Sequence, residues 1–285
     1  MTTILGLLPV TLGSLDLLAT DGAGVDWVIT DVKGWDSPGV RAELAPRQAD
    51  HGAWASPVYL DARPITLTGS IVAPTREAMD AAIEQLIVAV SLTDTTLTIG
   101  ESTPKQATVR RSGQLLIERQ GPYSATYSAL VTAADPRRYS TVLQSQSTGL
   151  PSVTGGLTLP ITLPITISTT STGGGFTLSN AGTIATRPTF TLRGPAASPV
   201  ITATRPDGTI YQLAYSQTLG AGDTLVIDTA AHSVILNGSV SRRPFLSAQP
   251  SWPEILPGSS LAVRWTASAY DPAALLTGTC RSAWM

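Results

Sequence analysis

Apolar residues in one part of this chain recur every three to four positions, which is the period of an α-helix. The residues that follow this period are Met79, Ala82, Ile83, Leu86, Ile87 and Val90. This spacing places them on a single helix face. Thr75 can cap the N-terminus, Glu77 suits the positive end of the helix dipole, and residues 91–94 provide a stop. We expect one helix at about residues 75–92.

Most of the remaining chain consists of short runs of β-branched and aromatic residues bounded by Gly, Pro or Asp, which predict strands. In the first half these runs are residues 58–60, 65–68, 96–99, 107–111, 115–119 and 124–132. In the last third they are residues 189–193, 200–205, 210–215, 224–228, 233–236 and 261–266. Asp207-Gly208 and Asn237-Gly238 predict two-residue hairpin turns, because both central positions tolerate positive φ.

The pattern therefore predicts a mainly β protein, with an N-terminal β-rich domain carrying one helix and a C-terminal antiparallel β-sandwich. We expect the first domain at residues 1–142 and the sandwich, with a short C-terminal tail, at residues 176–285. An uncharged Pro/Thr/Gly-rich connector, which includes the first strands, is expected at residues 143–175. The connector contains the tandem Thr158-Leu159-Pro160-Ile161 and Thr162-Leu163-Pro164-Ile165, whose prolines favour an extended edge or linker.

Composition narrows the possible partners. The 285 residues include 18 basic and 20 acidic side chains, so no basic surplus is available for nucleic acid. Only 13% of residues are charged, against the roughly 25% that is usual, which indicates that much of the surface is covered by other subunits. Pro9 and Asp16 interrupt the apolar N-terminal stretch, so we expect no export signal, and no apolar run is long enough to span a membrane.

The residue types that carry catalysis or bind metals are scarce. Cys280 is the only cysteine, and His51 and His232 are the only histidines, which excludes a two-histidine metalloprotease motif and an intrachain disulfide. Gly258-Ser259 is followed by a strand-like run and not by a helix, so it predicts a turn and not a nucleophile elbow. We expect no enzymatic activity, no cofactor and no metal site.

Several local patterns, in order from about Val25 to Ala269, resemble the distal tail family of siphophages. In the first domain they are Gly52-Ala53-Trp54, Tyr59, residues 63–69, the helix and residues 134–139. In the second they are residues 159–165, Asn180-Ala181-Gly182-Thr183, Pro188-Thr189-Phe190, Arg193-Gly194-Pro195, residues 222–229, residues 234–238 and Leu256-Pro257-Gly258-Ser259. Ser259 is followed by Ser260, whereas the expected pattern has Asn after Pro-Gly, which leaves the geometry of that turn open.

The resemblance implies a non-enzymatic virion protein that forms a ring, hexameric in the family, at the distal end of the tail tube. The first domain would form the ring, and the second would be a galectin-like sandwich on its outside. The implied partners are further copies of the chain, the major tail tube protein, the tape-measure protein and the tail-associated hub protein. The implied location is the virion, after assembly in the host cytoplasm.

A ring subunit functions by association, in which a few aromatic or arginine anchors carry most of the binding energy. Trp27, Trp35, Trp54 and Arg63 are the candidate anchors, although each is equally consistent with a core or partly exposed role. A second hypothesis is a carbohydrate-binding module for host glycans, with Trp252 and Trp265 as the sugar platform. A tail-associated hydrolase is a third hypothesis, disfavoured by the missing catalytic constellation.

Overall fold

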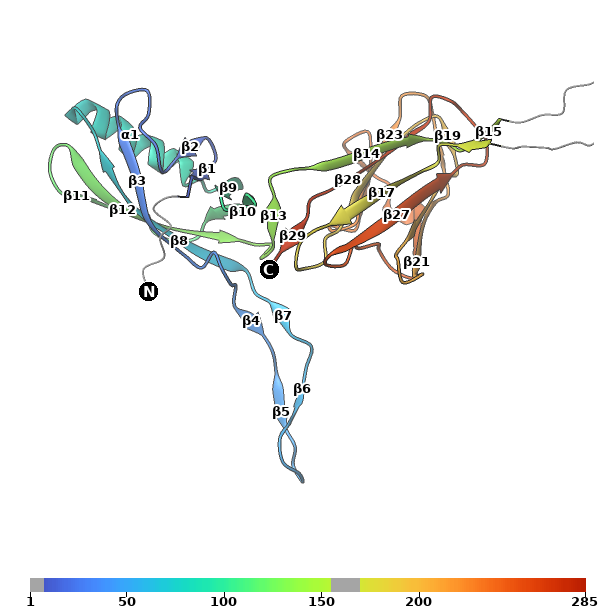
Figure 1. The fold of residues 1–285 in the computed structure, drawn as a ribbon, viewed down its shortest axis with the longest axis horizontal. Helices are drawn as coiled ribbons and strands as arrows, with labels where there is room; N and C mark the ends of the chain where they lie inside the picture. The colour runs from blue at the N-terminus through green and yellow to red at the C-terminus, as the bar shows by residue number, and fades with distance from the viewer. Residues whose placement is uncertain (1–7, 155–169) are drawn as a thin grey trace, which may run out of the picture. The chain divides into compact units, whose positions relative to one another are not determined.

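The computed structural model describes residues 8–154 and 170–285 (Figure 1). The chain divides into a first unit, Met1–Thr141 with Trp284–Met285, and a second unit, Val142–Ala283. The fold is mainly β, as predicted from the sequence. The tandem at Thr158-Leu159-Pro160-Ile161, together with its repeat, lies outside the described residues.

The first unit is built on antiparallel strands in the order β2-β1-β9-β10-β12-β8-β3, with β11 paired to β12 and β13 paired to β10. Their bounds are β1 Val10–Leu12, β2 Leu15–Asp16, β3 Asp26–Lys33, β8 Arg63–Val72, β9 Thr95–Ile99, β10 Lys105–Arg111, β11 Leu116–Arg119, β12 Ser124–Ala133 and β13 Arg138–Ser140. The last strand, β29 (Ala283–Trp284), straddles the division between the units.

Strands β8 and β12 form the centre of the first unit, because they pair over ten residues and alternate buried with less buried side chains. Ile65, Leu67 and Ile71 of β8 point into the core. Opposite them, the ring of Tyr127 covers Gly69, where an added Cβ would lie 2.4 Å from the tyrosine oxygen. The glycine therefore makes room for the aromatic ring in the middle of the sheet.

The helix α1 spans Arg76–Ala89 and is shorter at its C-terminus than expected. Thr75 caps it as predicted, because its side chain accepts a hydrogen bond from the Ala78 amide. The predicted apolar face is buried with one exception: Ile87 is 40% exposed. That residue belongs to the solvent-facing side of the helix, so including it in the core face was wrong.

A long hairpin projects from the first unit between β3 and β8 (Figure 1). It consists of two paired segments, with β4 (Val40–Arg41) against β7 (Tyr59–Leu60) and β5 (Leu44–Pro46) against β6 (Ala53–Ala55). The turn at its tip is closed by the Arg47 amide, which donates to the carbonyl of Gly52. Only the part at residues 58–60 was predicted as a strand.

The second unit contains two antiparallel sheets that share one hydrophobic core. One sheet has the order β14-β28-β18-β23-β24-β25, with bounds Gln144–Gly149, Leu275–Cys280, Thr189–Arg193, Thr224–Asp228, Ser233–Leu236 and Val240–Ser241. The other has the order β17-β27-β20-β21-β26, with bounds Gly175–Asn180, Ser259–Thr266, Val200–Thr204, Ile210–Tyr215 and Leu246–Gln249.

Short elements complete the second unit. They are β15 (Ser152–Thr154), β16 (Thr170–Thr172), β19 (Ala196–Ala197), β22 (Thr218–Leu219) and the 3-10 turn η2 (Arg243–Phe245).

Both loops of the second unit that were predicted as two-residue hairpin turns are longer than two residues. At Asn237-Gly238, β24 ends at Leu236 and β25 begins at Val240, although both residues have positive φ and the Ser239 amide donates to the Leu236 carbonyl, as in a tight turn. The loop at Asp207 is longer than the predicted two residues, because β20 ends at Thr204 and β21 begins at Ile210. Only Gly208 has positive φ there, while the Asp207 carboxylate accepts a hydrogen bond from the Thr209 amide.

Candidate functional site

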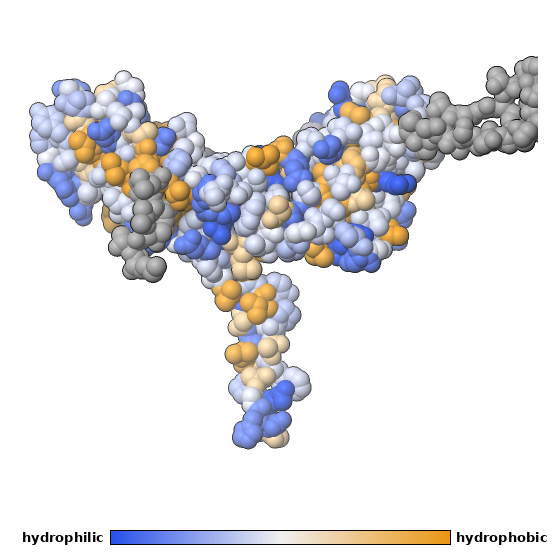
Figure 2. Space-filling view, viewed as in Figure 1, coloured by the Kyte–Doolittle hydropathy of each residue, from blue (hydrophilic) through white to orange (hydrophobic). Residues whose placement is uncertain are grey.

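The hairpin carries the largest group of exposed apolar side chains on one element of the first unit. Its members are Val40, Leu44, Trp54, Val58 and Tyr59, each between 59% and 67% exposed. Figure 2 shows hydrophobic surface along the hairpin. Its backbone groups are satisfied by pairing within the hairpin, but these side chains pack on neither of the two cores. Exposed apolar surface that is gathered in one place usually marks an interaction site.

Trp54 is the predicted anchor that the structure places on this surface. It is 67% exposed, and the Arg47 guanidinium lies over its ring, 4.5 Å from the ring centroid. Arg47 also forms an ion pair of 3.4 Å with Asp50 at the tip of the hairpin. The indole is therefore held in position with much of its surface uncovered, which suits a contact residue.

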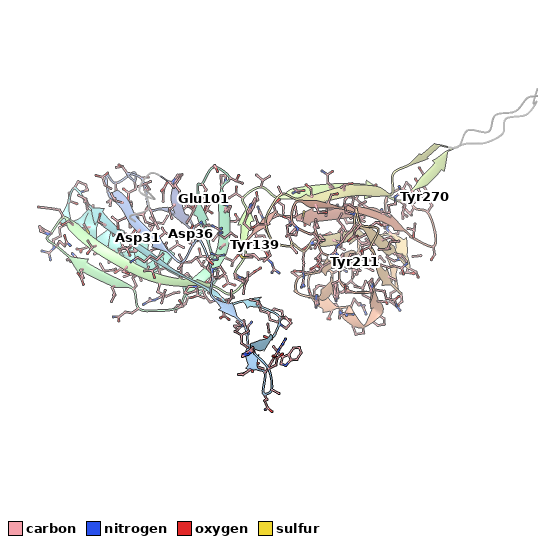
Figure 3. All side chains as sticks on the ribbon, turned by 60° about the horizontal axis from the view of Figure 1, so that its bottom comes forward. Asp31, Asp36, Glu101, Tyr139, Tyr211 and Tyr270 are labelled. Carbon is pink, nitrogen blue, oxygen red and sulfur yellow. The ribbon has the colours of Figure 1, made fainter. Side chains whose placement is uncertain are left out.

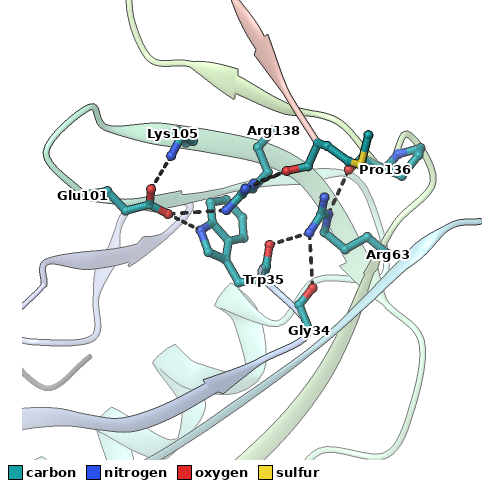
Figure 4. Close-up of polar contacts among 8 residues, drawn as sticks. Gly34, Trp35, Arg63, Glu101, Lys105, Pro136 and Arg138 are labelled. Carbon is teal, nitrogen blue, oxygen red and sulfur yellow. Dashed lines mark hydrogen bonds and ion pairs between the residues drawn. The ribbon is translucent and has the colours of Figure 1, made fainter. Parts of the chain in front are cut away.

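Arg63 has a different place from the one predicted, since its side chain is completely buried at the base of the hairpin. Its Nε donates to the carbonyl of Pro136 at 2.8 Å, and its Nη1 donates to the carbonyls of Gly34 and Trp35 (Figure 4). Gly34 and Trp35 follow β3 and Arg63 begins β8, so the guanidinium joins the two ends of the hairpin. A side chain buried in its own unit cannot anchor a neighbour, and the anchor interpretation of Arg63 was wrong.

The positive charge of Arg63 is destabilised by burial and by the nearby positive charge of Arg138. Burial lowers its pKa, the nearby Arg138 lowers it further, and Asp36 partly offsets both, which leaves the pKa at about 10. Its Nη2 is buried and has no hydrogen-bond partner within the described residues. This side chain remains a cation at neutral pH, and the backbone carbonyls around it provide its main stabilisation.

Trp35 belongs to a charged network beside Arg63. Its indole nitrogen donates to Glu101 at 2.6 Å, and the same carboxylate pairs with Lys105 and, at 3.6 Å, with Arg138. Burial acts to raise the pKa of Glu101, but the hydrogen bonds from Lys105 and Trp35 outweigh it and hold that pKa below its usual value. Glu101 is labelled in Figure 3 together with Asp36 and Tyr139 of the same unit.

Trp27 and Trp35 are each only 2% exposed, so both are core residues of the first unit. The Trp27 indole nitrogen lies 3.4 Å from the Asp21 carboxylate. The Trp35 ring lies against the guanidinium of Arg138, 5.4 Å from the centroid. Neither ring has free surface for a neighbour, so the prediction that Trp27 and Trp35 are interface anchors was wrong. Of the four predicted anchors, Trp54 alone remains exposed.

The two tryptophans of the predicted sugar platform do not form one. Trp265 is 1% exposed, and its indole nitrogen donates to the carbonyl of Gly149 at 2.9 Å inside the second unit. Trp252 is half-buried, with His232 stacked on it at 4.9 Å and the Arg243 guanidinium also 4.9 Å from its centroid. Trp265 was therefore wrongly assigned, and the ring of Trp252 is already partly covered.

The apolar surface of the hairpin and the Arg63 hydrogen bonds at its base were not predicted from the sequence. A signal existed for the first, since residues 36–62 contain several apolar residues without the alternation of a strand that has one buried face. No local signal pointed to the second, because the contact between Arg63 and Pro136 joins residues 73 positions apart.

Within residues 8–154 and 170–285, no group of three or more His, Cys, Asp and Glu side chains is arranged to hold a metal ion. No helix in that part of the chain combines the length and apolar character needed to cross a membrane.

Comparison with solved structures shows the same fold in phage tail proteins. SPP1 Dit, described as a paradigm of the hub adsorption apparatus in phages that infect Gram-positive bacteria, superposes with a TM-score of 0.63 at 12% identity, covering 98% of this chain and 100% of that one. A chain of the activated phage p2 baseplate with strontium has a TM-score of 0.52 at 9% identity, covering 95% and 97%. A chain of the same baseplate with calcium has a TM-score of 0.50 at 8% identity, covering 93% and 99%.

Sequence comparison adds evidence for the second unit. No curated protein matches the chain. Residues 181–272 match the family model of the siphovirus-type tail component, C-terminal domain. These residues include the strands β18, β20, β21, β23 and β27 of the sandwich. The resemblance inferred from the sequence is therefore confirmed: residues 181–272 match the C-terminal domain of siphovirus-type tail components, and the chain has the fold of SPP1 Dit.

Proposed function

We propose that this chain is a structural subunit of the distal tail of a long-tailed phage, where six copies form a ring between the tail tube and the tip. The first unit forms the ring, and the second unit lies on its outside as a galectin-like sandwich. The ring contacts the major tail tube protein, the tape-measure protein and the tail-associated hub protein. The role is structural and not enzymatic, and assembly takes place in the host cytoplasm.

The hairpin surface is the observation that carries this proposal. Five large apolar side chains stand exposed on a projecting element that needs no neighbour for its own backbone pairing. Burying such side chains against a second copy contributes about 1.5–3 kcal/mol for each one that is fully covered. The contact is heterologous if the hairpin of one copy meets another face of the next, and repetition of such a contact closes a ring of six when each copy is rotated by one sixth of a turn relative to the one before.

Open sheet edges in the first unit support the same conclusion. Strand β11 pairs only with β12, so its other edge is free within the described residues. Strand β3 pairs with β8, and on its other side only its first residues, Asp26 and Trp27, bond to Thr20 and Ala19, so the rest of that edge is free within the described residues. The register shift between Ile29 and Asp31 interrupts β3, which limits unwanted pairing along that edge. The unpaired backbone groups of β11 and of the rest of β3 are available to neighbours in a ring.

The proposal is tested by removing the hairpin without disturbing its base. Residues 42–58 are replaced by Asn-Gly, which connects Arg41 and Tyr59, a directly paired couple, through a two-residue turn. The mass of the native chain, measured in solution and alone or with tube and hub proteins, should correspond to a ring of six. The shortened variant should remain folded and lose the ring. A native chain that stays monomeric with every tail partner, or that is found elsewhere in the particle, would contradict the proposal.

A further inference from the structure

Besides the hairpin, the first unit has an open groove beside α1. The groove has a volume of about 1060 Å³ and lies between α1, the loop after β1 and the segment that leads into β9. This volume is slightly larger than the roughly 300–1,000 Å³ that small-molecule sites occupy. The openness of the groove along a helix suits the side chains of a protein segment.

One side of the groove is a regular stripe of the helix. Residues Ala81, Glu84, Gln85, Val88 and Ala89 line it, at the spacing that places residues on one helical face. This stripe differs from the buried face of α1, which consists of Met79, Ala82, Ile83 and Leu86. Val88 is 75% exposed, so α1 has a second, partly apolar face with no cover within the described residues.

The accessible part of the opposite wall consists of Gly13, Leu15 and Ala19, while Leu12 and Trp27, which also border the groove, are buried in the core. Its small members, like Ala81 and Ala89 on the helix, allow another backbone to approach closely. A helix of a partner would therefore lie alongside α1 with its large side chains between the two walls.

The charge around this groove has one sign. Asp16, Asp21, Glu84 and Asp94 line it, and no Lys or Arg does. Asp94 is paired with Arg110 at 2.7 Å, whereas Glu84 has no ion pair or hydrogen bond from its side chain within the described residues. The Asp21 carboxylate accepts hydrogen bonds from the amides of Ala23 and Val25, which keeps it in place at the rim.

The acidic lining of the groove indicates which protein segment can bind there. The hairpin and its base, residues 34–62, hold four acidic side chains against two basic ones, so the hairpin of a second copy would bring like charge to the groove. We infer that the groove beside α1 binds a cationic amphipathic helix of another tail component, with apolar side chains against Val88 and Lys or Arg at the acidic rim. The inference rests on the proposed function, because it assumes that the chain is an assembly subunit.

The test uses the full chain and two synthetic 18-residue helical peptides, one of Leu and Lys and one of Leu and Glu. Native protein should bind the Leu/Lys peptide, more weakly as salt is raised, and should not bind the Leu/Glu peptide. Glu84→Lys should weaken binding by about tenfold or more. Val88→Ser should weaken it by about fivefold to tenfold through the lost apolar contact. Glu118→Lys makes the same change of charge at an exposed position on β11, outside the groove, and should leave binding unchanged.

The inference would be overturned if Glu84→Lys and Glu118→Lys weakened peptide binding equally, or if Val88→Ser left the binding unchanged. Either result would mean that the peptide is attracted by charge alone and not by this groove. The mass of each variant is measured in parallel. Loss of the ring in Glu84→Lys would mean that a second copy covers the groove, and the partner would be wrongly assigned. Peptide binding that follows the expected pattern in a chain that forms no ring would support the groove while contradicting the ring.

Discussion

Each unit contains a buried polar side chain that forms several hydrogen bonds with the backbone of distant segments, Arg63 in the first unit and Asn180 in the second, and the two side chains differ in charge. In the second unit, Asn180 donates to the carbonyls of Ile184 and Ile255 at 2.7 and 3.1 Å. Its side-chain oxygen accepts from the amides of Gly182 and Ala283 at 3.0 and 3.1 Å. A neutral amide can thus be satisfied entirely by backbone groups, as buried polar side chains usually are.

In the first unit, the side chain with the comparable role is the cation Arg63. One of its nitrogens has no hydrogen-bond partner within the described residues. A buried cation costs more desolvation free energy than an amide does. It also reaches further, and its one planar group joins three carbonyls from two separate segments, Gly34-Trp35 and Pro136. In the sandwich, the neutral side chain of Asn180 joins the backbone segments. In the first unit, the charged side chain of Arg63 does so at the base of the hairpin. The difference suggests that Arg63 fixes the hairpin as well as the fold.

The largest effect is expected from Arg63→Met, which keeps the volume of the side chain but removes every donor. The carbonyls of Gly34, Trp35 and Pro136 lose their partner, and the free energy of unfolding of the first unit should fall by about 3–5 kcal/mol. Calorimetry checks this, because the transition of the second unit should not move. Arg76→Met, at an exposed position on α1, is the matched control. Equal shifts in both variants would remove the special role of Arg63.

Asn180→Ala should have the next largest effect, now on the second unit. Two donors and one acceptor are lost from a fully buried position, which should lower the free energy of unfolding by about 2–4 kcal/mol. Denaturant unfolding followed by Trp265 fluorescence reports on this unit. Gln212→Ala, exposed on β21, should change little. If Asn180→Ala is as stable as the control, Asn180 does not stabilise the second unit in the way that Arg63 is expected to stabilise the first.

Glu101→Gln tests the contribution of the charges around Arg63. It should lower the free energy of unfolding by about 1–2 kcal/mol at neutral pH, which is a smaller effect because Glu101 is partly exposed. The pKa of Glu101 in the folded protein lies below its usual value, because the hydrogen bonds from Lys105 and Trp35 outweigh the effect of burial. Its stabilisation is therefore complete above the unfolded pKa and is lost as pH falls through the folded pKa. Thermal unfolding from pH 7 to pH 3 should show a shallower loss of stability in the variant. Identical pH profiles would exclude this contribution.

Trp54→Ser should have the smallest effect on folding, within about 0.5 kcal/mol, because the side chain is exposed. Its effect should appear instead in assembly, where ring formation weakens by about tenfold or more. Concentration-dependent mass measurements separate the two quantities. Tyr123→Ser, also exposed in the first unit but outside the hairpin, is the control. Equal loss of assembly in both variants would show that the hairpin holds no special contact.

The sequence by itself determined most of the local structure. The 3.6-residue period and the Thr75 cap gave α1, and alternation with turn residues gave five strands of the sandwich with the bounds or nearly the bounds observed. These signals are local, because they depend on backbone preference and on which face of an element is apolar. The order of the motifs also led to the correct family resemblance.

Only the tertiary structure decided which of the prominent side chains are buried. Trp27, Trp35, Trp54 and Arg63 look alike as aromatic or cationic residues in a β-rich segment, yet three are buried and one is exposed. The pairing of β8 with β12 brings Arg63 close to Pro136, and no local pattern encodes such a contact. The groove beside α1 also depends on how the loop after β1 packs near the helix. Burial is a property of the packed chain, so the association surfaces became visible only after folding.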